Sequence, residues 1–505
     1  MMPEAASYRL RFLFVVVVPA AVLMALEIVS SRLLAPEFGN SVYVWGSIIG
    51  VFLAAMSGGY LLGGRLADRR PELRELGQLL LLAAMLQWAT ALAGRHGVAS
   101  IGGATEGRPS GTLLAAALLF GPATLLLATV APFAVRLAGR DPARLGGVAG
   151  NLFALSTAGS LVGTLAATFT LIPNLPLDAI LALLVSATAL AAAASFGRSA
   201  AALGAVAVAA LAWLTPTLGP RASGVLVERA TPYQTLVVRD SDGDRYLSSD
   251  GTLHGSIDVT TGETTLEYAR SSVSLALYSP HPRRVLMLGL GTGGVGRYLL
   301  SRVPSIDEAV YVDIDPAVAE IARAYFGFEP GPRERVVVAD ARRFLAADAG
   351  GWDWIYADTY IGHSVPFHLA TREFFELVRA RLAPGGAFGI NLAGSVRNAF
   401  PRAIVRTLGQ VFHQLDIYGV PGSGNYLLVA WNGGAIPVST LLERAAALEP
   451  AMAAPAGLRR LAQFRVALDL DLSRAPILTD QFAPIDSLLD VTLRDAGPES
   501  AAPAR

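Results

Sequence analysis

Two residue types are missing from this chain of 505 residues, and a third class is scarce. The sequence contains no cysteine, which excludes disulfides, thiolate nucleophiles and zinc sites built on sulfur. It also contains no lysine, so its strongly basic side chains are all arginines and Schiff-base chemistry is excluded. Charged residues make up only 16% of the chain, and the net charge of zero gives no basic footprint for nucleic acid.

Apolar residues are abundant instead, at 53% of the chain, which is more than an ordinary soluble protein of this length carries. A helix needs roughly 20 apolar residues to cross about 30 Å of hydrocarbon. Seven stretches approach this length, the last only marginally, and the first is too long for a cleaved signal peptide. They are Phe12–Ile28, Val42–Leu62, Leu76–Ala93, Thr112–Leu137, Val148–Ile172, Leu177–Phe196 and Ala200–Leu214. We therefore expect a transmembrane helical bundle over residues 1–219, with six to eight spans.

The loops between these stretches carry clustered arginines, which by the positive-inside rule lie in the cytoplasm together with the amino terminus. The clusters are Arg65, Arg69, Arg70 and Arg74 in one loop and Arg136, Arg140 and Arg144 in another. Seven crossings would place the second half of the chain outside the cell. We expect an even number instead, so that either one of the two closely spaced stretches around Arg198 does not cross or an extra crossing is hidden. The expected location is the inner (plasma) membrane, multi-pass, with a cytoplasmic catalytic domain.

The composition changes abruptly at Arg221 to polar, β-rich sequence. The stretch from Tyr233 to Gly255 alternates like strands, and Asp242-Gly243 is typical of a tight hairpin turn. This pattern predicts a small antiparallel β-sheet domain over residues 220–282. Strands and helices then alternate over residues 283–505, which predicts a doubly wound, mostly parallel α/β sheet of the Rossmann-like type. The expected strands are "RVLMLGL", "AVYVDID", "RVVVAD", "WDWIYAD" and "GGAFGINLAG".

A glycine-rich turn follows the first of these strands, with Gly289, Gly291 and Gly293, and permits a ligand close to the backbone. The next three strands end in Asp313, Asp340 and Asp358. Ligands bind at this edge of such sheets, where an acid at the end of the second strand can hold ribose hydroxyls. An acid at the end of the third strand can accept a hydrogen bond from the adenine amino group. Dinucleotide-binding folds share the glycine turn, but three successive acids fit S-adenosylmethionine better. For each aspartate alone, a helix cap is the alternative interpretation.

Longer motifs resemble a known family, the spermidine synthases or aminopropyltransferases, and within it a membrane-integrated branch fused to a multi-span amino-terminal region. The resemblance rests on "SRLLAPEFGNSVYVWGSIIG", "GGYLLGGRLADRR", "TPYQTLVV", "LMLGLGTGG", "VDIDP", "ADAR", "DTYIGHSVPFHLATREFFELVRARLAPGG" and "TDQFAPID". It implies an enzyme that takes decarboxylated S-adenosylmethionine, moves its aminopropyl group to an amine and releases 5'-methylthioadenosine.

The resemblance also implies roles for individual residues. The catalytic acid is Asp358, and Tyr233 is an aromatic wall of the amine pocket. Tyr360 would be a second such wall, with ordinary loop packing as the alternative interpretation. The cofactor contacts are Gln234, His254, Gly289, Gly291, Gly293, Asp313, Ile314, Asp340 and Ala341. Among them Asp313 lies at the ribose, Asp340 at the adenine, and His254 stands where relatives place a glutamine.

The chain departs from the family where carboxylates recognise polyamine charge. Thr292 and Ile361 stand at positions where the soluble enzymes carry aspartate, and Ala269-Arg270 replaces a His-Glu pair. A buried ammonium without a partner is costly, so tight binding of a diamine is not expected. Losing an acid near the tail of the cofactor makes intact S-adenosylmethionine, which carries a carboxylate, more acceptable.

Three other functions stay open from the sequence. The chain could be an S-adenosylmethionine lyase or cyclase, a methyltransferase, or a transporter whose soluble domain senses the cofactor. The expected partners are the lipid bilayer and a small-molecule amine or nucleoside substrate, with no nucleic acid and with a homodimer left open. No metal is expected, because His281, His363, His368 and His413 share no ligand spacing.

Overall fold

The structure is a computed structural model, and it divides into two compact units. It describes residues 2–39, 41–105, 108–139, 141, 144–197, 200–218, 224–360, 364–395, 398–420, 422–454, 456–466 and 471–489. The first unit comprises Met1–Ser223 with Arg229–Thr235, and the second comprises Gly224–Glu228 with Leu236–Arg505. Each unit is described by itself.

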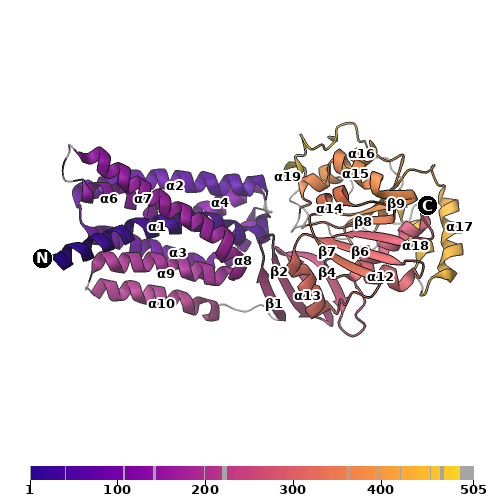
Figure 1. Cartoon of the computed structure of the whole chain (residues 1–505), viewed down its shortest axis with the longest axis horizontal. Helices are drawn as coiled ribbons and strands as arrows, with labels where there is room; N and C mark the ends of the chain where they lie inside the picture. The colour runs from indigo at the N-terminus through magenta and orange to yellow at the C-terminus, as the bar shows by residue number, and fades with distance from the viewer. Residues whose placement is uncertain are drawn as a thin grey trace. The chain divides into compact units, whose positions relative to one another are not determined.

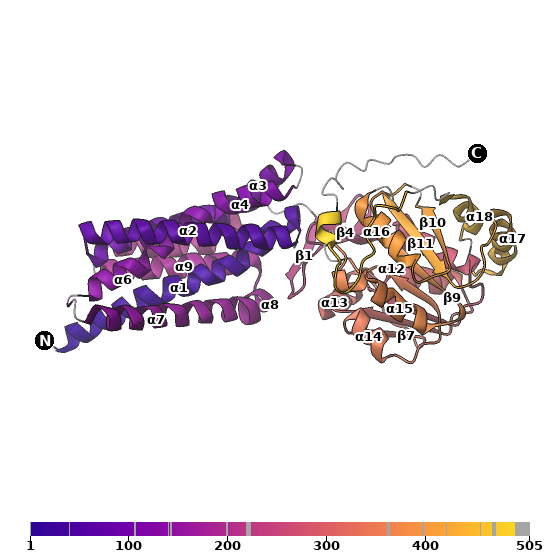
Figure 2. The same ribbon diagram turned by 90° about the horizontal axis from the view of Figure 1, so that it is seen from above.

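The first unit is helical, and its long helices run side by side in both Figure 1 and Figure 2. Its helices are α1 (Met2–Phe38), α2 (Val42–Arg69), α3 (Leu73–Ala104), α4 (Pro109–Leu119), α5 (Gly121–Ala128), α6 (Val130–Ala138), α7 (Leu145–Ala166), α8 (Ile172–Asn174), α9 (Leu177–Phe196) and α10 (Ala200–Leu218), with a π-helical turn at Ala167–Leu171. Ser41 caps α2 by accepting a hydrogen bond from the backbone N–H of Val44.

Among the described residues, six helical segments are long and apolar enough to cross a membrane. They are Tyr8–Phe38, Val42–Arg69, Leu73–Ala104, Gly121–Ala138, Leu145–Asn174 and Leu177–Phe196. The expected seventh segment, Ala200–Leu214, lies in α10, and its apolar part is shorter than a span. Their number matches the even number of spans expected from the sequence, and crossing itself stays a prediction.

One expected span is interrupted. The sequence predicts a single helix over Thr112–Leu137, whereas the structure ends α4 at Leu119 and divides the rest into α5 and α6. Pro122 lies at the start of α5 and Pro132 inside α6. Proline lacks a backbone N–H and crowds the preceding turn, which explains why hydropathy alone overestimates the continuity of this helix.

Small residues let α7 pack closely on α1. A Cβ atom at Gly159 would lie 2.6 Å from the Val17 carbonyl oxygen, and one at Gly163 would lie 2.0 Å from that of Ala21. The two glycines are four residues apart and so share one face of the helix. This is the close helix packing that is typical of a G-x-x-x-G step.

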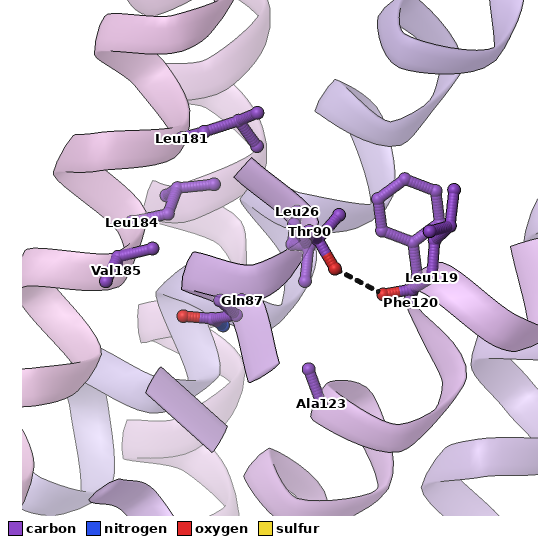
Figure 3. Close-up of a pocket in the computed structure, with 9 residues that line it drawn as sticks. All are labelled: Leu26, Gln87, Thr90, Leu119, Phe120, Ala123, Leu181, Leu184 and Val185. Carbon is purple, nitrogen blue, oxygen red and sulfur yellow. Dashed lines mark hydrogen bonds between the residues drawn. The ribbon is translucent and has the colours of Figure 1, made fainter. Parts of the chain in front are cut away.

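A small cavity of about 10 Å³ lies inside this unit, lined mainly by leucine and alanine with Gln87 and Thr90 of α3 (Figure 3). The Thr90 hydroxyl donates to the Leu119 carbonyl oxygen at 2.8 Å. Gln87 is only 3% exposed. Its side-chain amide has no hydrogen-bond partner at either atom among the residues that the structure describes.

We predict that Gln87→Met raises the melting temperature of the purified protein by several degrees. An unpaired buried polar group costs about 1–3 kcal/mol, and methionine has a similar volume. Thr90→Val is the control, and it should lower the melting temperature because it removes a hydrogen bond that is made. Thermal unfolding in one detergent measures both, and a drop for Gln87→Met would show that its amide is satisfied.

The small sheet of four strands has the order β1-β2-β3-β4, with β1 (Val225–Ala230), β2 (Thr235–Ser241), β3 (Asp244–Ser249) and β4 (Thr252–Asp258). Asp242 and Gly243 join β2 to β3 with φ values of 54° and 88°. Two successive positive φ values characterise the type I′ hairpin turn. The predicted turn is therefore confirmed.

The larger sheet has the order β12-β10-β11-β9-β8-β5-β6-β7. Its strands are β5 (Arg284–Leu288), β6 (Glu308–Asp313), β7 (Glu334–Val338), β8 (Trp352–Ala357), β9 (Leu382–Ala393), β10 (Gln414–Gly419), β11 (Asn425–Trp431) and β12 (Arg465–Val466). The five strands from β5 to β9 pair in parallel, as the alternating pattern predicts. The pairs of β11 with β9 and of β10 with β11 and β12 are antiparallel, so the sheet is mixed.

Helices cover both faces of this sheet and enclose two hydrophobic cores. Figure 1 shows α14 (Ala341–Ala347), α15 (Arg372–Arg381) and α16 (Ala399–Leu408) on one face and α12 (Gly294–Arg302) and α13 (Pro316–Phe326) on the other. The shorter helices are α11 (Glu267–Ser271), α17 (Val438–Leu448), α18 (Leu458–Gln463) and α19 (Ile485–Leu488), with 3₁₀ turns η3 (Ser272–Leu277), η4 (Phe367–Leu369) and η5 (Glu449–Ala451). Helices on both faces of a largely parallel sheet form a Rossmann-type fold.

Candidate functional site

The glycine turn lies against the end of β8. The backbone N–H of Asp358 donates to the Leu288 carbonyl oxygen at 2.8 Å. Gly289 has a φ of +98°, and a Cβ atom there would lie 2.2 Å from the carbonyl oxygen of Asp358. Only glycine fits both conditions. The turn and Asp358 are therefore one closely packed unit at the carboxyl edge of the sheet. Gly291 and Gly293 continue the turn with φ values of 54° and 73°.

Asp313, at the end of β6, faces the same turn. Its carboxylate accepts hydrogen bonds from the backbone N–H of Leu290 at 3.0 Å and of Asp315 at 2.9 Å. Burial raises the pKa of Asp313 to about 6, although these backbone N–H groups work in the opposite direction. Each carboxylate oxygen has two acceptor sites, so Asp313 can still accept from ligand hydroxyls. Ile314 follows it and is half-buried.

Asp340 follows β7 closely and is the N-cap of α14. Its carboxylate accepts from the backbone N–H of Arg343 at 2.9 Å, and its other oxygen lies 2.8 Å from His368 Nε2. Burial favours a higher pKa for Asp340, but the hydrogen bonds from Arg343 and His368 outweigh it and hold the pKa below its usual value. The capping interpretation therefore applies to this aspartate. Its adenine role, and that of the buried Ala341 beside it, stay predictions.

Asp358 has a different environment. Asn391, at the end of β9, donates from Nδ2 to Asp358 Oδ1 at 2.9 Å. Asn425 Nδ2 in turn donates to Asn391 Oδ1 at 2.9 Å, which orients the Asn391 amide. Burial raises the pKa of Asp358 to about 6, and the Asn391 hydrogen bond and the adjacent Tyr268 hydroxyl limit the rise. This carboxylate has no arginine or histidine partner in the described part of the chain.

Tyrosines surround this carboxylate. The Tyr268 hydroxyl donates to the His254 carbonyl oxygen at 3.0 Å and lies against Asp358. His254 lies in β4, and its carbonyl oxygen lies 3.5 Å from the position of a Cβ at Gly291, which brings β4 to the glycine turn. The Tyr360 hydroxyl accepts from the backbone N–H of Ala393 at 2.8 Å. Burial raises the pKa of Tyr360 above its usual value, and the charge of Asp358 raises it further.

Tyr233 and Gln234 lie in a turn that belongs to the first unit. Their backbone N–H groups donate to Thr231 Oγ1 at 3.1 Å and 3.0 Å. In the same unit, Arg32 of α1 donates to the carbonyl oxygens of Thr231 and Pro232 at 2.8 Å and 2.9 Å. The proposed contacts of Tyr233 and Gln234 with substrate stay predictions. Ile361 and His363 lie outside the described residues.

Three residues of this site were not selected from the sequence. Asn391 ends a strand that was predicted, so its place at the carboxyl edge was a signal that could have identified it. Tyr268 directly precedes Ala269-Arg270, the pair that departs from the family pattern, and nothing in the sequence marks it as a neighbour of Asp358. His368 precedes α15 and reaches Asp340 only in the folded chain. Thr292, which replaces an expected acid, is 4% exposed, and its Oγ1 accepts from the backbone N–H of Gly294 at 3.3 Å.

The arrangement places a glycine turn of the kind that can receive a nucleoside next to a proton acceptor. The glycine turn and Asp313 present backbone and carboxylate groups, and Asp358 lies next to them with a pKa close to neutrality. A base of this kind is suited to taking a proton from a reacting group near pH 7. No group of three or more metal-ligating side chains occurs among the described residues.

Comparison with known proteins points to one family. A family model for the spermine/spermidine synthase domain matches residues 271–418. The chain is 28% identical over 277 residues to a polyamine aminopropyltransferase of Vibrio vulnificus, covering 53% of this chain and 92% of that protein. It is 31% identical over 222 residues to one of Aeropyrum pernix, covering 42% and 69%. A solved structure of a probable spermidine synthase from Corynebacterium glutamicum matches with a TM-score of 0.40 and 20% identity, over 52% of this chain and 97% of that one.

We predict that Asp358→Asn stabilises the protein more at pH 7.5 than at pH 4.5. The pKa of Asp358 rises from 3.8 to about 6 on folding, so between these values the folded chain binds more protons than the unfolded chain. Stability therefore falls as the pH rises through this window, and the penalty is complete above pH 6. The gain at pH 7.5 should reach about 1–3 kcal/mol. Denaturant unfolding at both pH values measures it, and an equal effect at both would contradict the raised pKa.

Proposed function

The chain belongs to the polyamine aminopropyltransferase family of transferases, and we propose that it transfers the aminoalkyl group of an S-adenosylmethionine-type sulfonium to a small amine, with Asp358 as the base. The observation that carries this proposal is the position of Asp358. Its backbone packs directly against the glycine turn, and its half-buried carboxylate has a pKa of about 6.

The proposed reaction is a single displacement. The lone pair of the amine nitrogen attacks the carbon next to the sulfonium, a C–N bond forms and the C–S bond breaks. The electron pair of the broken bond goes to sulfur, which leaves as the neutral thioether 5'-methylthioadenosine. The proton lost from nitrogen goes to Asp358. Such a step depends mainly on orienting the nucleophile in line and providing a base.

Two neighbours support Asp358 in this role. Asn391 donates a hydrogen bond to the carboxylate and the Tyr268 hydroxyl lies against it, so the carboxylate is oriented while its pKa stays near the working pH. Tyr268 is itself tied to the His254 carbonyl oxygen, next to the glycine turn. The proposal gives Asp313 the ribose hydroxyls, since it faces the same turn.

The donor is either decarboxylated or intact S-adenosylmethionine. Thr292 is an uncharged residue in the glycine turn, where the family has an acid that holds the amine at the end of the cofactor. An uncharged turn does not repel the carboxylate of intact S-adenosylmethionine. The second candidate function is therefore lyase or cyclase chemistry on the intact compound, which would also release 5'-methylthioadenosine.

Membrane integration is part of the proposal. It is supported by six helices with the length and composition of spans and by the arginine-rich loops, which by the positive-inside rule favour the cytoplasmic side for both ends of the bundle. The catalytic unit would then meet cytosolic S-adenosylmethionine. The bundle would anchor the enzyme at the inner (plasma) membrane.

Product analysis tests the function directly. The purified protein is incubated with isotopically labelled S-adenosylmethionine or its decarboxylated form, with and without amines, and all products are identified by mass spectrometry. We expect labelled 5'-methylthioadenosine together with an alkylated amine. Release of 5'-methylthioadenosine without an amine would favour the lyase or cyclase. S-adenosylhomocysteine would show methyl transfer, and no product from either donor would refute the proposal.

We predict opposite effects for two aspartate variants. Asp358→Asn keeps the shape of the side chain but removes the base, so turnover should fall by about 10² to 10⁴ while donor affinity hardly changes. Asp313→Ala should first weaken donor binding, because a hydrogen bond to a carboxylate contributes about 1.5–3 kcal/mol. Calorimetric titration beside turnover assays distinguishes them. Normal turnover by Asp358→Asn would exclude this strand end as the reaction centre.

We also predict that turnover is lost as the pH falls through about 6, because Asp358 is then protonated and cannot accept a proton. Asn391→Leu removes a hydrogen bond that lowers this pKa, so its acid limb should shift to higher pH. A profile of kcat against pH for both proteins measures the shift. An unshifted limb in Asn391→Leu would mean that another group controls it.

A further inference from the structure

Tyr356 carries a buried hydroxyl that the proposed reaction does not yet use. It lies in β8 two residues before Asp358, and side chains two residues apart on a strand share one face of the sheet. The residue is 1% exposed. Its hydroxyl oxygen is buried without a hydrogen-bond partner in the described part of the chain.

Other buried tyrosines of this unit are satisfied. The Tyr311 hydroxyl donates to Glu334 Oε1 at 2.6 Å, Tyr278 bonds Asp416 and Tyr418, and Tyr360 accepts from Ala393. Buried hydroxyls in proteins nearly always have a partner, because an unpaired one destabilises the fold. Phenylalanine would fill the same space as Tyr356 without this penalty. The hydroxyl is thus unfavourable for folding alone.

The neighbouring strand leaves room for the Tyr356 ring. Gly389 of β9 is its register partner. A Cβ atom at Gly389 would lie 3.1 Å from Cδ2 of Tyr356 and 2.8 Å from Cδ1 of Leu275. Glycine inside a strand is unfavourable, and it often marks a close approach of other groups. Gly389 and Tyr356 therefore form a matched pair, and Asn391 lies two residues further along the same strand.

The Tyr356 hydroxyl lies near the proposed reaction centre. Burial raises the pKa of Tyr356 well above its usual value, and the charges of Asp358 and Tyr360 raise it further. Tyr356 likewise raises the pKa of Tyr268, which contacts Asp358. The hydroxyl is consequently neutral at the working pH. It can both donate and accept a hydrogen bond beside that carboxylate.

We infer that the Tyr356 hydroxyl accepts a hydrogen bond from the nucleophilic amine and so helps to aim its lone pair, an inference that rests on the proposed function. A primary amine about to attack has two N–H groups and one lone pair. Asp358 takes one N–H, the oxygen of Tyr356 takes the other, and the lone pair is left to face the carbon next to sulfur. Such three-point orientation raises the fraction of amines in an attacking geometry.

The experiment compares Tyr356→Phe with Tyr311→Phe. Tyr311 lies in the same core, is 1% exposed and has a partnered hydroxyl, so it is a matched control. Melting temperature is measured for both variants and the wild type. Affinity for n-butylamine and for 1,4-diaminobutane is then measured by calorimetry with 5'-methylthioadenosine bound, and donor affinity is measured separately. Turnover is assayed with the donor and acceptor that give product.

For Tyr356→Phe we expect an unchanged or higher melting temperature, amine binding weaker by about tenfold and a KM for the amine raised to match. Donor affinity should not change. Tyr311→Phe should lower the melting temperature and leave amine binding as in the wild type. This split separates a substrate contact from a structural role.

Several results would overturn the inference. They are unchanged amine affinity in Tyr356→Phe, a loss of melting temperature as large as in the control, weakening of the donor alone, or no amine binding by the wild type. A wild type that binds amine but forms no product would refute the proposed function. In that case the comparison of amine affinities still decides the role of Tyr356.

Discussion

Close contact between the glycine turn and the end of β8 is the constraint on which the site depends. Because Gly289 has no side chain, the backbone of Asp358 can lie where a Cβ would otherwise be, and the Asp358 N–H closes a hydrogen bond to Leu288. The contact places Asp358 beside the glycine turn, the surface proposed to receive a nucleoside. Burial of the carboxylate is the main cause of its raised pKa.

Neutral groups, and not cations, control the environment of Asp358. Asn391 donates to it, and Tyr268, Tyr356 and Tyr360 lie nearby. A partner arginine would hold the pKa low and weaken the base. Amides and hydroxyls keep the carboxylate oriented while its pKa stays near 6. Asp340 shows the contrast, since a backbone N–H and His368 hold its pKa below the usual value.

The same chain places unpaired polar groups in two very different cores. Gln87 lies in the first, helical unit, and its side-chain amide has no hydrogen-bond partner among the described residues. Tyr356 lies in the second unit, and its hydroxyl likewise has no partner among them. Only Tyr356 adjoins a group with proposed chemistry. In a marginally stable fold, each such group is a measurable loss of stability. Comparing variants at the two positions distinguishes a loss of folding stability that serves the proposed reaction from one that does not.

The sequence by itself determined the alternation of strands and helices, the Asp242-Gly243 turn, and the aspartates at the carboxyl ends of β6, β7 and β8, because these depend on local periodicity and turn chemistry. It did not reveal the break of Thr112–Leu137 into α4, α5 and α6, since hydropathy averages over prolines. Only the tertiary structure brought Asn391 and Tyr268 close to Asp358 and His368 close to Asp340. It also decided that the Tyr356 hydroxyl has no hydrogen-bond partner in the described part of the chain. These contacts join strands and helices distant in the chain, and their geometry and burial exist only after the sheet has formed.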